Sequence, residues 1–204
     1  MIRVVTIGGE YGSDRAEIGR QLAGVLGWRL LDNDLIEQIA VRAHVSPDVA
    51  RQYDECSDPW FHRVQKALWR GGYEGVATTS EDVFDADRMA EMARIIITEA
   101  ARQGNCVVVG RGSQCVLQHF PDAFHVFVYA PFGERVERLR RRGVQHPERE
   151  IAAVERRREA YVRRYYGQDW TNRHLYHLMI CSSIGEAACV ATILTAMEGQ
   201  RRPE

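Results

Sequence analysis

Residues 2–19 read IRVVTIGGEYGSDRAEIG, and this stretch decides the fold. Its first part, residues 2–7, is a compact β-branched run, which is typical of a buried strand. Glycine-rich residues 8–14 follow as a turn. From Arg15 apolar residues recur at helical spacing until Gly27, where a glycine can end a helix. The sequence therefore predicts a strand, a glycine loop and a helix in direct succession.

The same alternation continues along the chain. Apolar runs predict further strands at residues 28–31, 106–109, 125–130 and 178–181. Helical patterns predict helices at residues 87–102, 134–142, 147–166 and 184–197. Strands that alternate with helices favour a parallel sheet covered on both faces. We therefore expect one α/β domain over residues 1–204 with three layers, interrupted by an insertion at about 46–87 where prolines and glycines break the pattern.

The charge balance argues against a polyanionic partner. Lys and Arg number 27 against 28 Asp and Glu, so the net charge is -1 and no global field attracts nucleic acid or a membrane surface. The only lysine is Lys66, so a phosphate site must use guanidinium or backbone N–H groups. The chain has no run of 18 apolar residues and its cysteines are scattered, which predicts a cytoplasmic protein with reduced thiols.

The glycine loop is a candidate phosphate site, because N–H groups at a helix start hold phosphate oxygens. The phosphate-loop motif G-x-x-x-x-G-K-[ST] adds a lysine for the outer phosphates and a hydroxyl for magnesium. Its first glycine, last glycine, lysine and hydroxyl align with Gly9, Asp14, Arg15 and Ala16. The alternative is a tight turn that binds nothing. The predicted phosphate-binding and ATP-binding residues are Gly9, Glu10, Tyr11, Gly12, Ser13 and Asp14.

Several segments together resemble the cytidylate kinase-like family. They are EYGS and EIG at residues 10–13 and 17–19, LDNDLI at 31–36, GRG at 110–112 and FPDA at 120–123. The resemblance covers most of the chain. It implies a P-loop kinase fold with a helical insertion that binds a nucleoside monophosphate, at about 46–87, and an arginine-rich lid at about 143–176.

The resemblance also implies an acceptor site. Gly112 stands where true cytidylate kinases have the aspartate that reads cytosine, and Gln38 stands where they have an arginine for the acceptor phosphate. Arg88 or Arg94 would then supply that contact. A structural ion pair at a strand end is the alternative role for Arg111. The predicted acceptor-binding residues are Asp32, Asp34 and Arg111.

Arginines crowd the helix predicted at residues 147–166, which resembles the lid of the family. Phosphoryl transfer depends on positioning in-line oxygens and on offsetting the charge of the migrating group, and lid arginines do both when they close. A solvated basic face is the alternative. The predicted catalytic residues are Arg15, Arg157, Arg158 and Arg164.

These features predict a nucleoside monophosphate kinase that transfers the γ-phosphate of ATP to a pyrimidine nucleotide. Mg²⁺ would be held by phosphates and water, without a metal site built from side chains. One alternative is a kinase-fold sensor that binds a nucleotide or anion without catalysis. Another is a kinase of a small non-nucleotide alcohol. The expected partner is a small-molecule nucleotide, and a homodimer is left open.

Overall fold

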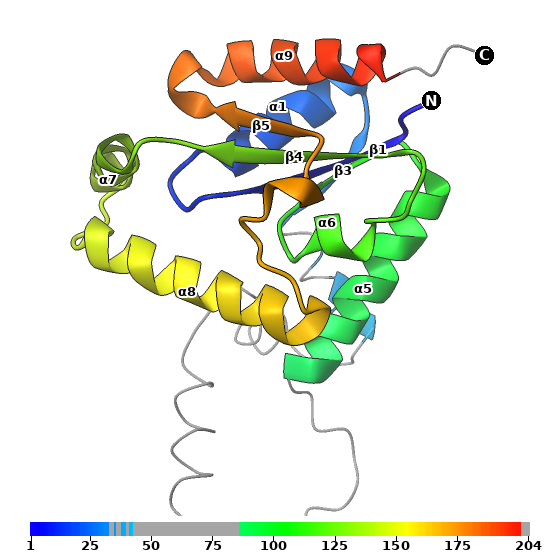
Figure 1. The fold of residues 1–204 in the computed structure, drawn as a ribbon, viewed down its shortest axis with the longest axis horizontal. Helices are drawn as coiled ribbons and strands as arrows, with labels where there is room; N and C mark the ends of the chain where they lie inside the picture. The colour runs from blue at the N-terminus through cyan, green and yellow to red at the C-terminus, as the bar shows by residue number, and fades with distance from the viewer. Residues whose placement is uncertain (33–34, 36–37, 40, 43–85, 201–204) are drawn as a thin grey trace, which may run out of the picture.

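A five-stranded parallel sheet with helices on both faces forms the molecule (Figure 1). The computed structural model describes residues 1–32, 35, 38, 39, 41, 42 and 86–200. The strand order is β2-β3-β1-β4-β5, so β1 lies at the centre. The predicted three-layer α/β architecture is confirmed. The strands are β1 (Val4–Gly9), β2 (Arg29–Leu31), β3 (Cys106–Val109), β4 (Ala123–Tyr129) and β5 (Leu178–Cys181).

The helices form a layer on each side of the sheet. Figure 1 shows α1 and α9 above the strands and α5, α6 and α8 on the opposite side. The α-helices whose full bounds lie in the described residues are α1 (Arg15–Leu26), α5 (Ala86–Gln103), α6 (Ser113–Val116), α7 (Phe132–Arg141), α8 (Pro147–Tyr166) and α9 (Glu186–Gly199). The described part of the chain also contains the short 3₁₀ helices η1 (Arg173–Leu175) and η2 (Ser182–Ile184).

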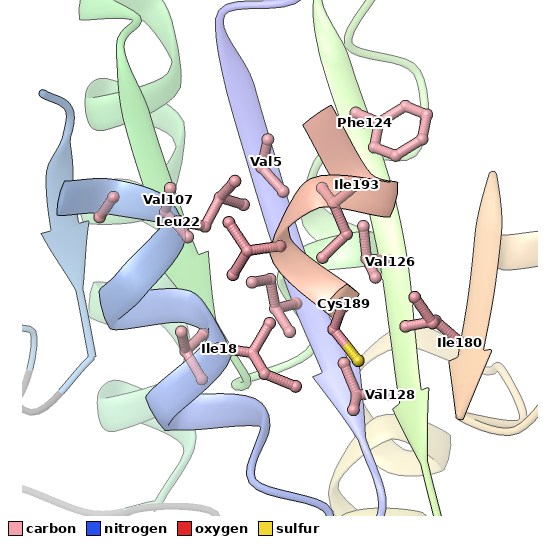
Figure 2. Packing of buried hydrophobic residues seen from close by; sticks show 14 of the residues in the cluster. Val5, Ile18, Leu22, Val107, Phe124, Val126, Val128, Ile180, Cys189 and Ile193 are labelled. Atoms are coloured by element: carbon pink, nitrogen blue, oxygen red, sulfur yellow. The ribbon is translucent and has the colours of Figure 1, made fainter. Parts of the chain in front are cut away.

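Strand β1 is buried along its whole length, because both of its faces are covered. Val5 packs under α1 and α9, where Figure 2 shows it among Ile18, Leu22 and Ile193. Val4 belongs to the apolar cluster on the other face, which contains residues of α5. Burial on both faces explains why the strand reads as a continuous apolar run without alternation. The loop that follows β1 therefore starts from a rigid base.

The predicted elements agree closely with the structure. Strands β3 and β5 and helix α8 have the predicted bounds, and other ends differ by at most two residues. Helix α6 and both 3₁₀ helices were not predicted. Val25 falls in the apolar pattern of α1, yet it is 66% exposed. In the described part of the chain, no helix is both long enough and apolar enough to cross a membrane. Residues 46–85 of the predicted insertion lie outside the described residues.

A stacked histidine pair joins β4 to the segment before β5. The backbone N–H of His125 donates to Nδ1 of His177 at 2.9 Å, and the two ring centroids are 5.0 Å apart. Thr6 of β1 shares a 2.8 Å hydrogen bond with Nδ1 of His125. Burial, aided by His177, lowers the pKa of His125 to about 4. His125 is therefore neutral in the folded protein at neutral pH.

Acid should weaken the fold through His125. The pKa of His125 is about 4 in the folded protein, below the ordinary value of 6.5. Between pH 6.5 and 4 the unfolded chain therefore binds more protons at this residue than the folded chain does, and the folded state loses stability as pH falls. We expect the free energy of unfolding to drop by about 2 kcal/mol from this residue between pH 7 and 5. Urea titrations at several pH values measure it. His125→Asn should flatten this slope, whereas the exposed control His119→Asn should not. An unchanged slope in His125→Asn would contradict the assignment.

Candidate functional site

The glycine loop joins β1 to α1, and β4 approaches it closely. A Cβ atom on Gly9 would lie 2.2 Å from the backbone oxygen of Val128, so no larger residue fits there. The backbone N–H of Glu10 donates to the same oxygen at 3.0 Å. The Ser13 hydroxyl closes the turn by donating to the backbone oxygen of Glu10 at 2.8 Å. The loop is therefore fixed against β4 through its own backbone.

Asp14 has the backbone conformation of a glycine. Its φ of 62° lies in the left-handed region, which aspartate and asparagine tolerate better than most residues. This conformation agrees with the register in which Asp14 stands at the last glycine of the motif. Its carboxylate makes no capping hydrogen bond to α1. Instead it forms ion pairs with Arg138, at 3.2 Å, and with Arg142.

Further contacts from α7 hold the loop. Arg135 donates to the backbone oxygen of Tyr11 at 3.3 Å and pairs with the carboxylate of Glu10 at 3.3 Å. Arg138 also donates to the hydroxyl of Ser182, just beyond β5, at 2.7 Å. Guanidinium groups recognise carboxylate and phosphate oxygens with the same forked geometry. Helix α7 therefore brings anion-binding groups to the loop.

Helix α8 reaches the loop at Arg158. This side chain is 4% exposed, and it donates to the backbone oxygen of Gly9 at 2.9 Å. Its guanidinium also lies over the ring of Tyr11, 5.7 Å from the centroid. A buried guanidinium requires such partners, because an unpaired buried charge is costly. Arg158 therefore fixes the arginine-rich helix to the first glycine of the loop.

Arg111 and Asp32 lie close together at the ends of neighbouring strands. Arg111 follows β3, is 4% exposed, and donates to the backbone oxygen of Val109 at 3.3 Å. Its guanidinium lies 4.0 Å from the carboxylate of Asp32, which follows β2. The third predicted acceptor residue, Asp34, lies outside the described residues. The ion pair agrees with both of the roles weighed for Arg111.

A cavity of about 360 Å³ lies between α5 and the end of α8. Its charged groups pair with one another, since Arg94 contacts Glu91 at 2.6 Å and Arg164 contacts Asp87 at 2.8 Å. The cavity therefore carries no net formal charge from these four side chains. It is lined by Asp87, Ala90, Glu91, Arg94, Arg164, Tyr165 and Tyr166.

The sequence matches a known protein family over most of its length. A sequence profile described as the Cytidylate kinase-like family matches residues 4–184. The chain belongs to the cytidylate kinase-like family. The predicted resemblance is thereby confirmed, and the family supports a kinase. No curated protein matches the sequence.

Solved structures show that this family member has a P-loop kinase fold. An uncharacterized protein from Eubacterium ventriosum ATCC 27560 has 16% identity and a TM-score of 0.69, over 98% of this chain and 100% of that one. Shikimate kinase from Acinetobacter baumannii, solved with shikimate, has 15% identity and a TM-score of 0.56, over 100% and 97%. A gluconokinase from Sinorhizobium meliloti 1021 has 14% identity and a TM-score of 0.53, over 96% and 91%. At these identities the likeness extends to the fold alone.

The arginines predicted for this kinase-like site are spread along α1 and α8. Arg158 contacts the glycine loop, and Arg15 is the first residue of α1. Arg157 is half-buried beside Arg158 on α8. Arg164 lies two turns further along α8, where its guanidinium binds the carboxylate of Asp87. The structure therefore brings Arg158 to the loop and Arg164 to the cavity.

Sequence reasoning missed the arginines of α7 and Arg142, the residue that follows this helix. Arg135, Arg138 and Arg142 all contact residues of the loop. They recur three and four residues apart, so they share one helix face. That spacing, in a helix directly after a predicted strand, was the only available signal, and it shows a shared face without showing what the face contacts. The sequence predicted a helix at residues 134–142 but assigned no role to its arginines.

Tyr166 occupies the space beside Gly112, where true cytidylate kinases have an aspartate. A Cβ atom on Gly112 would lie 2.4 Å from Cε2 of Tyr166. The Tyr166 hydroxyl donates to the backbone oxygen of Arg111 at 3.5 Å, and its ring lines the cavity. The ring thus excludes a side chain at position 112. Position 112 therefore presents only backbone atoms.

The exclusion at position 112 can be measured with a matched pair of glycines. Gly112 and Gly167 have φ of 63° and 64°, and a Cβ atom on Gly167 would meet nothing within 4 Å. Both alanine variants incur left-handed strain of about 1 kcal/mol. Gly112→Ala should lose about 1–3 kcal/mol more, because its methyl group collides with Tyr166. Urea unfolding measures the difference, and equal losses would show that Tyr166 moves aside freely.

Proposed function

We propose that this protein is a nucleoside monophosphate kinase that transfers the γ-phosphate of ATP to a pyrimidine nucleoside monophosphate. One observation carries the proposal: Arg135, Arg138 and Arg158, from two helices, converge on the glycine loop after the central strand. Ligands of open α/β sheets bind at the carboxyl ends of the strands, which is where this loop lies. Family membership supports the same reaction class.

At the donor side, arginines replace the lysine of the usual motif. The loop residues Gly9–Asp14 and the start of α1 at Arg15 would hold the phosphate chain through backbone N–H groups. Arg157 and Arg158 would offset charge on the transferred phosphoryl group. A guanidinium suits this role because its forked donors match phosphate oxygens.

Magnesium would reach the site with the nucleotide. Ala16 has no hydroxyl, and the Ser13 hydroxyl is buried and donates to the backbone oxygen of Glu10. Among the described residues, no group of three or more His, Cys, Asp and Glu side chains could hold a metal ion. Mg²⁺ bound by phosphates and water would neutralise part of the phosphate charge. The arginines would then position the phosphate chain of the nucleotide rather than replace the Mg²⁺ ion.

At the acceptor side, Asp32, Asp34 and Arg111 would bind the acceptor together with the cavity. Tyr166 connects Arg111 to the cavity, since its hydroxyl donates to the backbone oxygen of Arg111 and its ring lines the cavity. Arg94 and Arg164 would bind the acceptor phosphate after leaving their carboxylate partners. The base would be read without help from position 112, which lacks a side chain.

Two other functions each have one observation in their favour. The ion pairs of Asp14 with Arg138 and Arg142 suit a sensor that binds an anion without transfer. The balanced charge of the cavity suits a small alcohol as the acceptor. The sensor predicts binding without turnover, and the alcohol kinase predicts turnover of a different acceptor, so a turnover assay combined with a binding measurement separates all three.

A coupled assay for ADP release tests the proposed function. We expect turnover with CMP, UMP or dCMP, and at least about tenfold lower kcat/KM with AMP and GMP, because recognition of the base contributes to transition-state binding. Absence of turnover with every monophosphate at high enzyme concentration would refute the nucleotide kinase. ATP binding without any turnover would favour the sensor, and turnover of a small alcohol the third function.

The role of Arg158 can be tested with a charge-conserving variant. Arg158→Lys keeps a positive charge but loses the forked donors, so kcat should fall about 100-fold with a smaller change in KM. Arg163→Lys is the control, because Arg163 lies on the same helix, is exposed and pairs with Glu159. Steady-state kinetics and thermal unfolding are measured on both. Equal kcat values in the two variants would make Arg158 a structural residue.

A further inference from the structure

A carboxylate of the glycine loop binds two of the arginines that surround the loop. Asp14 pairs with Arg138 at 3.2 Å and also with Arg142. Only 10% of its side chain is exposed, against 53% for Arg142. Both guanidiniums come from the last turn of α7 and its end, one helical turn apart. The carboxylate is thus enclosed by cationic groups at the point where α1 begins.

This arrangement has the features of an occupied anion site. A carboxylate offers guanidinium groups the same paired oxygens as a phosphate does. Asp14 is the residue directly before α1, a helix of 12 residues, yet its side chain does not cap that helix. A surface ion pair contributes little by itself, but a mostly buried carboxylate with two charged donors is held more firmly. The chain thereby supplies an anion next to its own glycine loop.

We propose that Asp14 is an internal competitor for the phosphate chain of the donor. Without nucleotide its carboxylate holds Arg138 and Arg142; when a polyphosphate binds, the phosphate oxygens replace it as the ligand of both arginines. The proposal rests on the donor site described above, though not on phosphoryl transfer. The protein binds polyphosphate only after Asp14 has left the two arginines, so the cost of displacing Asp14 lowers its affinity for polyphosphate. Repulsion between the Asp14 carboxylate and the phosphates lowers that affinity further.

Neutralising Asp14 should therefore strengthen polyphosphate binding. Asp14→Asn keeps the size of the side chain and tolerates the left-handed backbone, but removes the charge. Calorimetry with inorganic tripolyphosphate and with ATP should give a Kd at least about tenfold lower than wild type, because one competing carboxylate charge is removed. Asp14→Gly, which suits the same backbone, should show the same gain. Thermal unfolding verifies that each variant is folded.

A charge-matched control separates the local effect from the change in net charge. Glu137→Gln makes the same change of one unit on α7, where Glu137 pairs with the exposed residues Arg140 and Arg141. Its Kd for tripolyphosphate should stay within about twofold of wild type, because screened surface charges act weakly. In the Arg142→Ala background the gain from Asp14→Asn should shrink, since one released guanidinium is missing.

The outcomes distinguish this proposal from the proposed function. Equal or weaker tripolyphosphate binding by Asp14→Asn, or no binding by any variant, would overturn the competitor. So would an undiminished gain in the Arg142→Ala background. Because no acceptor is present, the measurement does not depend on catalysis. Tighter binding by Asp14→Asn together with no turnover of any monophosphate would refute the kinase while supporting the competitor.

Discussion

Pairing between guanidinium groups and the oxygens of the glycine loop is the interaction on which the site depends. The loop contains two carboxylates, Glu10 and Asp14, and both form ion pairs with arginines of α7. Backbone oxygens of the same loop accept from Arg135 and Arg158. The apolar cluster between α7 and α8 is small, and these polar contacts add to it in holding both helices at the loop. Further along α8, Val162 packs in a second apolar cluster with Phe127 of β4. Elsewhere in the molecule apolar packing against the sheet holds the helices.

Much of the fold could be predicted because its signals are local. Runs such as residues 106–109 and 178–181 are short, apolar and bounded by polar residues or glycines, so they specify buried strands without knowledge of their neighbours. The family resemblance rested on motifs within single loops. Both predictions were confirmed. Helix α6 was missed because four residues are too few for a periodic pattern.

The site was harder to predict because its contacts join distant parts of the chain. Asp14 meets Arg142 across 128 positions, and Tyr166 meets Arg111 across 55. A basic helix gives no indication of which of its arginines face a loop until the strand order is known. Side-chain length adds to the difficulty, since one guanidinium can serve Asp14 and Ser182 together. The assignments of Arg15, Arg157, Arg158 and Arg164 stay predictions until variants are assayed.

The arginine contacts around the loop also limit how its charge can be altered after synthesis. Acetylation removes positive charge only from amino groups, and the sole lysine of the chain is Lys66. The side chains that hold Glu10, Asp14 and the loop backbone carry guanidinium groups instead. A lysine acetyltransferase therefore has no substrate among them, and the loop keeps its cationic surroundings where a lysine-built phosphate site would lose them.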